Sequence, residues 1–224
     1  MNALARVLLS GAVQLVAVGV LLFIPAGTFD YWQAWTFLAV FALSAWLPSI
    51  YLQLTNPEAL QRRMRGGPVA EARPVQKAVM AGLYLSLALM CVVSGFDRRF
   101  GWSSVPTALC LLGDILVAAG LAVVVLVAVQ NSYASTTVQV EAGQQVVSTG
   151  LYGLIRHPMY TGNVIMLLGL PLALGSYWAL LFVIPGVGVL AWRIRDEERL
   201  LREQLPGYRE YTTTVRHRLV PLIW

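Results

Sequence analysis

The sequence predicts an all-α, polytopic membrane helix bundle, because it is rich in hydrophobic residues, poor in charged ones and contains several apolar runs of membrane-spanning length. Of the 224 residues, 58% are hydrophobic and 12% are charged, whereas soluble domains carry about 25% charged residues. A helix of roughly 20 apolar residues crosses the bilayer core. Four segments reach that length and predict four spanning helices: about 4–24, 33–54, 78–96 and 106–129.

A fifth apolar region, residues 160–192, predicts a helical hairpin. A single helix of this length would be too long for the bilayer core, and the region is interrupted at Gly175-Ser176 and at Pro185-Gly186, where Gly and Pro favour turns. We therefore expect two short arms, which are tolerated where they line a protein-walled cavity. A cytoplasmic amphipathic tail is expected after the hairpin.

The distribution of basic residues predicts the orientation. Of the 16 Lys and Arg residues, Arg98 and Arg99 fall on one side of the predicted spans and all the others on the opposite side. The positive-inside rule then places both termini and the loop 55–77 in the cytoplasm, as expected for a multi-pass protein of the cell inner membrane. The net charge of +5 suits an anionic inner leaflet, so no nucleic-acid partner is expected.

The chain is expected to divide at about residue 130. Residues 1–130 contain the four predicted spans and the loop 55–77, whereas the polar motifs gather in residues 131–224. The stretch 131–150 is rich in small hydroxyl side chains and contains no Lys or Arg. A loop of this length is more often functional than a passive connector.

The triplet Arg156-His157-Pro158 stands at the mouth of the predicted hairpin. Ionisable residues beside a bilayer cost free energy unless they are paired or hydrated, so they are functional candidates. Pro158 lacks a backbone N–H and disfavours the α conformation at His157. The triplet is therefore expected to form a shaped entrance to the helix that follows.

A carboxylate on an apolar helix face is predicted in the tail. At helical spacing, Glu198 shares a face with Ile194, Leu201 and Leu205. Other charged residues are expected to point elsewhere and to be solvated: Asp196, Arg199 and Glu203. A simpler interpretation is that Glu198 pairs with Arg202 at i,i+4, a contact worth about 0.2–0.5 kcal/mol.

The chain has too few metal-ligating residues for a His/Cys metal site. It contains two His and two Cys, and Cys91 and Cys110 lie in or at the edge of apolar spans, where a free Cys packs as a small hydrophobic residue. No metal is therefore expected. Glycine-rich phosphate-binding motifs of soluble nucleotide folds are also absent from the sequence.

Four motifs occur together in the second half of the chain. They are Gln144-Gln-Val-Val-Ser-Thr-Gly-Leu-Tyr152, Arg156-His-Pro-Met-Tyr-Thr-Gly162, Glu197-Glu198-x-Leu200 and Pro206-Gly207-Tyr208-x-x-Tyr211. Together they resemble the isoprenylcysteine carboxyl methyltransferase and phospholipid methyltransferase superfamily, and a weaker similarity covers Asn56-Pro57-Glu58-Ala-Leu60. The chain departs from the eukaryotic prenylcysteine enzymes at Gln144, where those enzymes have His.

The resemblance implies an S-adenosylmethionine-dependent methyltransferase with a cytoplasmic cofactor cavity. It implies catalytic roles for Arg156, His157 and Glu198. Arg156 suits a carboxylate through forked hydrogen bonds, and Glu198 suits an ammonium or a ribose hydroxyl. The full set of implied cofactor-binding residues is Gln144, Val146, Val147, Gly150, Tyr152, Arg156, His157, Tyr160, Glu197 and Glu198.

Several alternatives stay open at this stage. The adjacent carboxylates Glu197 and Glu198 both suit the cofactor, and His157 is either a base or a brace for the turn. A carboxylate acceptor needs no base, whereas a thiol or amine must first lose a proton.

The acceptor is expected to be a lipid or another lipophilic molecule. Carboxyl O-methylation of an isoprenylcysteine-like substrate is the first expectation. The alternative is N- or S-methylation of a phospholipid or a small hydrophobic thiol. A transporter or binding protein is the non-enzyme alternative, but it predicts internal repeat symmetry, which the sequence does not show.

Overall fold

The computed structural model describes residues 3–55, 73–131, 133, 138–140, 143–221 and 223–224. These residues are all helix or loop, with no strand among them, which confirms the predicted all-α class. The elements are α1 (Ala3–Ala26), α2 (Trp32–Thr55), α4 (Pro74–Phe100), α5 (Thr107–Gln130), the 3₁₀ helix η1 (Gly150–Gly153), α6 (Pro158–Ala173), the 3₁₀ helix η2 (Trp178–Phe182), α7 (Val183–Gln204) and α8 (Tyr208–Thr214). The family-like segment 56–60, and most of the loop 55–77, lie outside the described residues.

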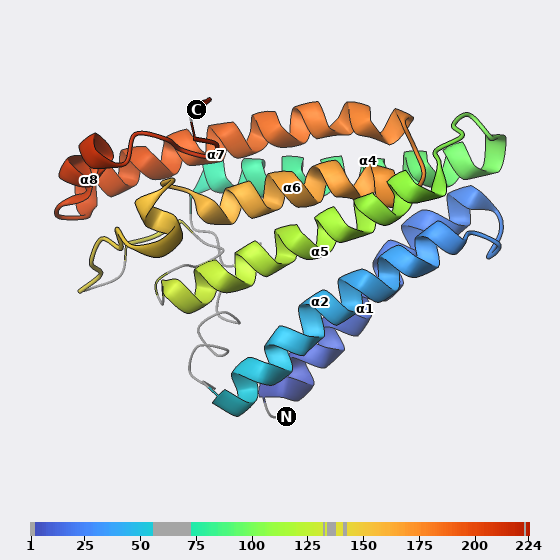
Figure 1. Cartoon of the computed structure of the whole chain (residues 1–224), viewed down its shortest axis with the longest axis horizontal. Helices are drawn as coiled ribbons and strands as arrows, with labels where there is room; N and C mark the ends of the chain where they lie inside the picture. Colours follow the sequence, from blue (N-terminus) through green and yellow to red (C-terminus); the bar gives the residue numbers. More distant parts are fainter. Residues whose placement is uncertain (1–2, 56–72, 132, 134–137, 141–142, 222) are drawn as a thin grey trace.

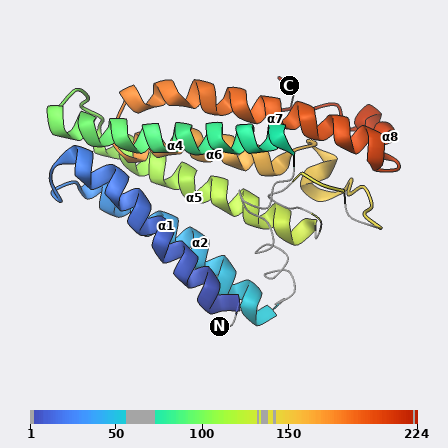
Figure 2. The same ribbon diagram turned by 180° about the vertical axis from the view of Figure 1, so that it is seen from behind.

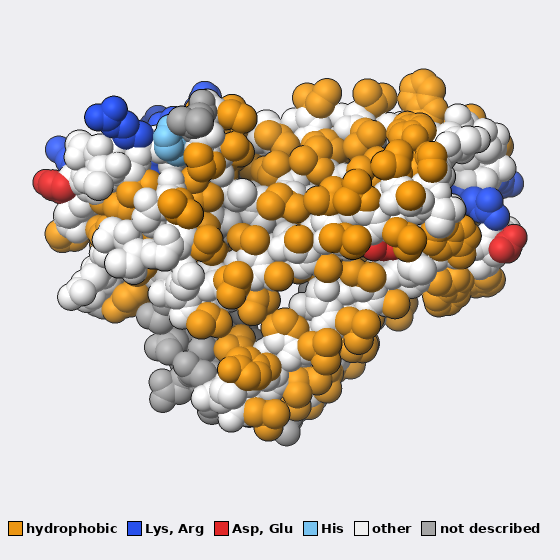
Figure 3. Space-filling model, in the orientation of Figure 1, with side chains coloured by type: hydrophobic (Ala, Val, Ile, Leu, Met, Phe, Trp, Pro, Cys, Tyr) orange, Lys and Arg blue, Asp and Glu red, His pale blue; other side chains and the backbone are white. Residues whose placement is uncertain are grey.

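Five helices among the described residues are long and apolar enough to cross a membrane: Leu4–Ala26, Trp32–Thr55, Pro74–Phe100, Thr107–Gln130 and Trp178–Gln204. The four predicted spans are therefore confirmed. Hydrophobic side chains cover most of the length of the visible surface, and most charged side chains lie toward its two ends (Figure 3). This distribution fits a multi-pass membrane protein.

The hairpin forms, but its second arm differs from the prediction. The chain turns after α6 at Gly175, whose φ of +71° is a left-handed conformation that glycine adopts without strain. Pro185 does not break the second arm, because it lies in the first turn of α7, where proline is tolerated. The expectation of a short second arm was wrong: α7 continues to Gln204 and includes the tail expected after the hairpin.

Helices α5 and α6 lie side by side and antiparallel (Figure 1), and they pack closely because glycines face each other across their interface. A Cβ added at Gly120 would lie 2.5 Å from the Gly162 carbonyl oxygen, and one at Gly169 would lie 2.7 Å from that of Gly113. Small residues at helix interfaces let backbones approach in membrane proteins. The start of α6 is thereby fixed against α5.

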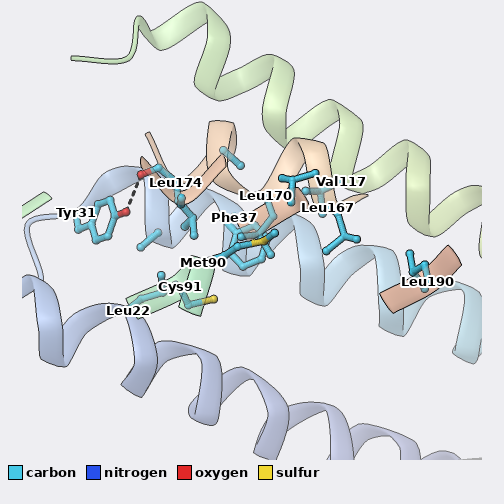
Figure 4. Packing of buried hydrophobic residues seen from close by; sticks show 14 of the residues in the cluster. Leu22, Tyr31, Phe37, Met90, Cys91, Val117, Leu167, Leu170, Leu174 and Leu190 are labelled. Carbon is cyan, nitrogen blue, oxygen red and sulfur yellow. Dashed lines mark hydrogen bonds between the residues drawn. The ribbon is translucent and has the colours of Figure 1, made fainter. Parts of the chain in front are cut away.

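The hydrophobic core extends along the bundle between α1, α2, α4, α5, α6 and α7, and one part of it lies near the α1–α2 turn (Figure 4). Leu22, Met90 and Leu167 are fully buried there. The Tyr31 hydroxyl donates a 2.6 Å hydrogen bond to the Leu174 carbonyl oxygen. From this end, α1 and α2 diverge from the other helices toward the N-terminus (Figures 1 and 2). Polar side chains gather at the other end of the bundle, around η1 and α8.

Candidate functional site

A cleft forms where η1, the start of α6, the last turns of α7 and α8 meet. It encloses about 800 Å³, its open mouth included. Its lining contains eight residues expected to bind a cofactor: Gln144, Val146, Val147, Tyr152, Arg156, His157, Tyr160 and Glu197. The structure thus brings most of the predicted site residues to one place.

The Arg156-His157-Pro158 triplet is held by residues from the C-terminal segment. The backbone N–H of Arg156 donates to the His217 carbonyl oxygen, and that of His157 donates to the Arg218 carbonyl oxygen, both at 2.9 Å. His157 is non-helical and Pro158 begins α6, as expected for the residue before a proline. The predicted shaped entrance is present, with a bracing segment that the sequence argument did not include.

Glu198 lies at the centre of a cluster of cationic side chains behind the cleft. Its side chain is 3% exposed, and its Oε1 lies 2.8 Å from Arg156 Nε and 3.3 Å from His157 Nε2. Its Oε2 accepts hydrogen bonds from Arg218 at 3.0 and 3.1 Å, and from Arg202 at 3.4 Å. The predicted buried face is confirmed, and the i,i+4 contact with Arg202 is also present. Glu198 does not line the cleft.

Glu197 points into the cleft instead. The Tyr160 hydroxyl donates a 2.6 Å hydrogen bond to Glu197 Oε2, and it accepts one of 2.8 Å from Arg193 Nε. Successive residues of an α-helix point about 100° apart, so the two adjacent carboxylates face different surroundings. Glu197 therefore lines the cleft, and Glu198 holds the residues that form its wall.

Asp196 was expected to be solvated, and this was wrong. The Asp196 side chain is buried, because α4 and Arg73, the residue before α4, cover it. Asp196 Oδ1 pairs with Arg73 Nη2 at 2.9 Å, and its Oδ2 accepts a 2.5 Å hydrogen bond from Gln76. Helical spacing within the tail could not reveal this, because both partners lie about 120 residues earlier in the chain.

Gly150 supports the cleft from outside its lining. It begins η1 with a φ of +59°, and a Cβ at this position would lie 2.8 Å from the Gln130 side-chain oxygen. That oxygen accepts a hydrogen bond from the backbone N–H of Leu151. Gly150 therefore lets the end of α5 cap the turn that carries Tyr152.

Buried tyrosines form one wall of the cleft. The Tyr211 hydroxyl donates a 2.6 Å hydrogen bond to the Tyr152 carbonyl oxygen. Burial raises the pKa of Tyr152 to about 12, although the hydrogen bond with Asn131 acts in the opposite direction. The Tyr152 phenol is therefore neutral at physiological pH. The Tyr208 hydroxyl is buried and has no hydrogen-bond partner within the described part of the chain.

Tyr208 and Tyr211 were not among the predicted site residues. Both belong to the Pro206-Gly207-Tyr208-x-x-Tyr211 motif, so the signal was present in the sequence. Gly207 has a φ of +81° and separates α7 from α8. The motif therefore turns the chain back and places both rings against the cleft.

Comparison with known proteins gives one family match and one relative. Residues 109–206 match the model of the phospholipid methyltransferase family. The chain is also 31% identical over 91 residues to the Delta(14)-sterol reductase TM7SF2 of Mus musculus, an alignment covering 39% of this chain and 22% of that relative. The chain thus spans about a fifth of the length of the relative.

The family match confirms the predicted resemblance to the superfamily over residues 109–206. The family match contains the Arg156-His157-Pro158 triplet and both glutamates, and it begins inside α5, before residue 131. The proposed division of the chain at residue 130 stays a prediction.

Proposed function

We propose that this chain, with its phospholipid methyltransferase family match, is an integral membrane S-adenosylmethionine-dependent methyltransferase that acts on a lipophilic acceptor. The observation that carries the proposal is the cleft that places Glu197, Arg156 and buried tyrosines at one end of an apolar helix bundle. The matched residues 109–206 include most of its polar lining.

The residues of the cleft fit the polar groups of S-adenosylmethionine. The cofactor carries a carboxylate, an ammonium, a ribose diol and a sulfonium cation. Arg156 uses Nε toward Glu198 and Nη1 toward backbone carbonyls, which leaves its second terminal nitrogen to bind a carboxylate. Glu197 Oε1 suits an ammonium or a ribose hydroxyl, and the Tyr208 hydroxyl offers a further hydrogen bond.

Methyl transfer from a sulfonium is an in-line displacement, so the chain's residues act mainly by positioning the reactants and excluding water. His157 lies against Glu198 and stacks on Tyr160 with ring centroids 5.6 Å apart. These contacts support the role of a brace for His157. If the acceptor must lose a proton, Glu197 is the carboxylate that faces the cleft.

Two acceptor classes follow from this proposal. A prenylcysteine-like carboxylate is already ionised near pH 7 and needs no base. A phospholipid amine, favoured by the description of the matched family, must be deprotonated first. Transfer of a labelled methyl group to each acceptor, measured across pH with wild type and Glu197→Gln, distinguishes them. At saturating cofactor, loss of transfer to the amine alone would assign Glu197 as the base.

Cofactor binding is the direct test of the proposal. We expect the purified protein to bind S-adenosylmethionine and S-adenosylhomocysteine in calorimetry. Because the sterol reductase relative is named as a reductase, a reduced nicotinamide dinucleotide is the matched comparison ligand. If the protein bound the reduced nicotinamide dinucleotide but neither S-adenosyl compound, the methyltransferase proposal would be contradicted and a reductase favoured.

We further propose that the cleft and both termini face the cytoplasm of a cell whose inner membrane holds the protein. The described basic residues support this, because Arg156 lines the cleft and five arginines after residue 192 line a groove on the other side of the same helix, α7. Single cysteines at positions 156 and 202 should be labelled from the cytoplasmic side, and one at 177 from the other side. Labelling of 156 and 202 from opposite sides would contradict the topology.

A further inference from the structure

A second cleft lies on the face of α7 turned away from the cofactor cleft. It encloses about 890 Å³, open to solvent, and shares no lining residue with the cofactor cleft. Five of its lining residues are arginines: Arg195, Arg199, Arg202, Arg209 and Arg218. We call it the arginine groove. The only carboxylates among its lining residues are Glu198 and Glu203, so the lining is positively charged overall.

The carboxylates do not neutralise the groove evenly. Glu198 is engaged by Arg202 and Arg218 on the groove side, and by Arg156 on the other side. Within the described part of the chain, Arg195 and Arg199 have no carboxylate at ion-pair distance, and both side chains are exposed. Like charges this close repel one another, so the groove favours an anion.

The position of the groove along α7 indicates where that anion comes from. Trp192 is 51% exposed and lies just before the groove, as tryptophans do at membrane interfaces. At 1.5 Å per residue, Arg195 and Arg199 stand about 4.5 and 10.5 Å beyond Trp192 along the helix. Headgroup layers extend about 5–8 Å beyond the hydrocarbon core. With Trp192 at the edge of the hydrocarbon core, Arg195 stands at headgroup level. Arg199 stands just beyond the headgroup layer, and its long side chain can reach back to it.

We propose that the arginine groove binds the phosphate-bearing headgroup of an anionic membrane lipid. Guanidinium groups bind phosphate oxygens through paired, charge-assisted hydrogen bonds. The bound lipid is distinct from the methyl acceptor, because Glu198 and the backbone of α7 separate the groove from the cofactor cleft. The assignment does not depend on the proposed methyl transfer.

Lipid retention measures this binding directly. Protein purified in detergent with equal amounts of phosphatidylglycerol and phosphatidylcholine is analysed by native mass spectrometry, and the ratio of the two retained lipids is the readout. We expect wild type to favour phosphatidylglycerol. Arg195→Gln and Arg199→Gln should each lower the ratio about fivefold, the factor equivalent to the contribution of one basic residue near an anionic surface.

Arg216→Gln is the matched control, because Arg216 is exposed in the C-terminal segment but does not line the groove. An equal loss with Arg216→Gln would show diffuse attraction and overturn the proposal, as would equal retention of both lipids by wild type. Inorganic phosphate is added in a further arm. If it abolishes phosphatidylglycerol retention at a concentration equal to that of the lipid, the groove is a site for a soluble anion instead. Cofactor binding is measured separately, so either proposal can fail alone.

Discussion

Two buried carboxylates stand toward opposite ends of the bundle, and their partners differ. Asp97, in the last turn of α4, accepts hydrogen bonds of 2.7 and 2.6 Å from the backbone and hydroxyl of Ser103, and one of 2.5 Å from the Ser176 hydroxyl. Glu198 is surrounded by three arginines and His157. Neutral donors satisfy the first carboxylate, and three arginines engage the second.

The difference shows that buried carboxylates can have very different surroundings, so burial alone does not predict a functional role. Asp97 joins α4 to the loop before α5 and to the turn between α6 and η2, and it lies outside the matched family region. Glu198 holds Arg156 and His157, which line the cleft, and it lies inside that region. The charge of the partners and their position on a cavity wall distinguish the two.

The largest expected effect is that of Glu198→Gln. This change leaves buried Arg156 and three neighbouring groups without their shared anion, and breaking a buried ion pair costs about 3–5 kcal/mol. We expect a large loss of thermal stability in detergent together with loss of methyl transfer. A variant as stable as wild type would show that the cluster contributes little to folding.

Glu197→Gln should affect binding more than folding. Glu197 lines the cleft, and a hydrogen bond to a charged group contributes about 1.5–3 kcal/mol. Cofactor affinity should therefore fall roughly 10- to 100-fold, with the melting temperature close to wild type. Calorimetry on this variant is compared with Glu203→Gln, which removes an exposed carboxylate outside the cleft. Equal effects of both changes would exclude a specific role for Glu197.

Asp97→Asn should show the opposite pattern. An amide in place of the carboxylate presents donors where the two serine hydroxyls and a backbone N–H now donate, and an unsatisfied buried polar group costs about 1–3 kcal/mol. Stability should fall by that amount while cofactor affinity stays unchanged. A loss of cofactor affinity without a loss of stability would contradict the distinction between a structural carboxylate at Asp97 and the carboxylates at the cleft end.

The smallest expected effect is that of Arg202→Gln. Arg202 is 46% exposed and contacts Glu198 at 3.4 Å. Exposed ion pairs contribute about 0–1 kcal/mol, and Arg218 and Arg156 remain on the same carboxylate. A change in stability above about 1 kcal/mol, measured by thermal unfolding, would make the i,i+4 contact more important than its exposure indicates.

The membrane spans could be predicted because an apolar run of about 20 residues has few stable structures other than a membrane-spanning helix. The Arg156-His157 entrance could also be predicted, since Pro158 restricts the backbone locally. The separate roles of Glu197 and Glu198 could not. Helical periodicity identifies a buried face, but only tertiary packing decides whether that face meets a cavity or a cluster of cations. The same limit explains Asp196, whose partners come from a distant segment.

The contacts between the triplet and the C-terminal segment have a consequence for biosynthesis. Arg156 is held by Val215, 59 residues later, and by the backbone of His217. While residue 215 is still inside the ribosome, the bundle can insert but this wall of the cleft lacks its support. We therefore expect a nascent chain arrested before residue 215 to be membrane-inserted and unable to bind cofactor, so that the site matures only after the segment 215–218 has been made.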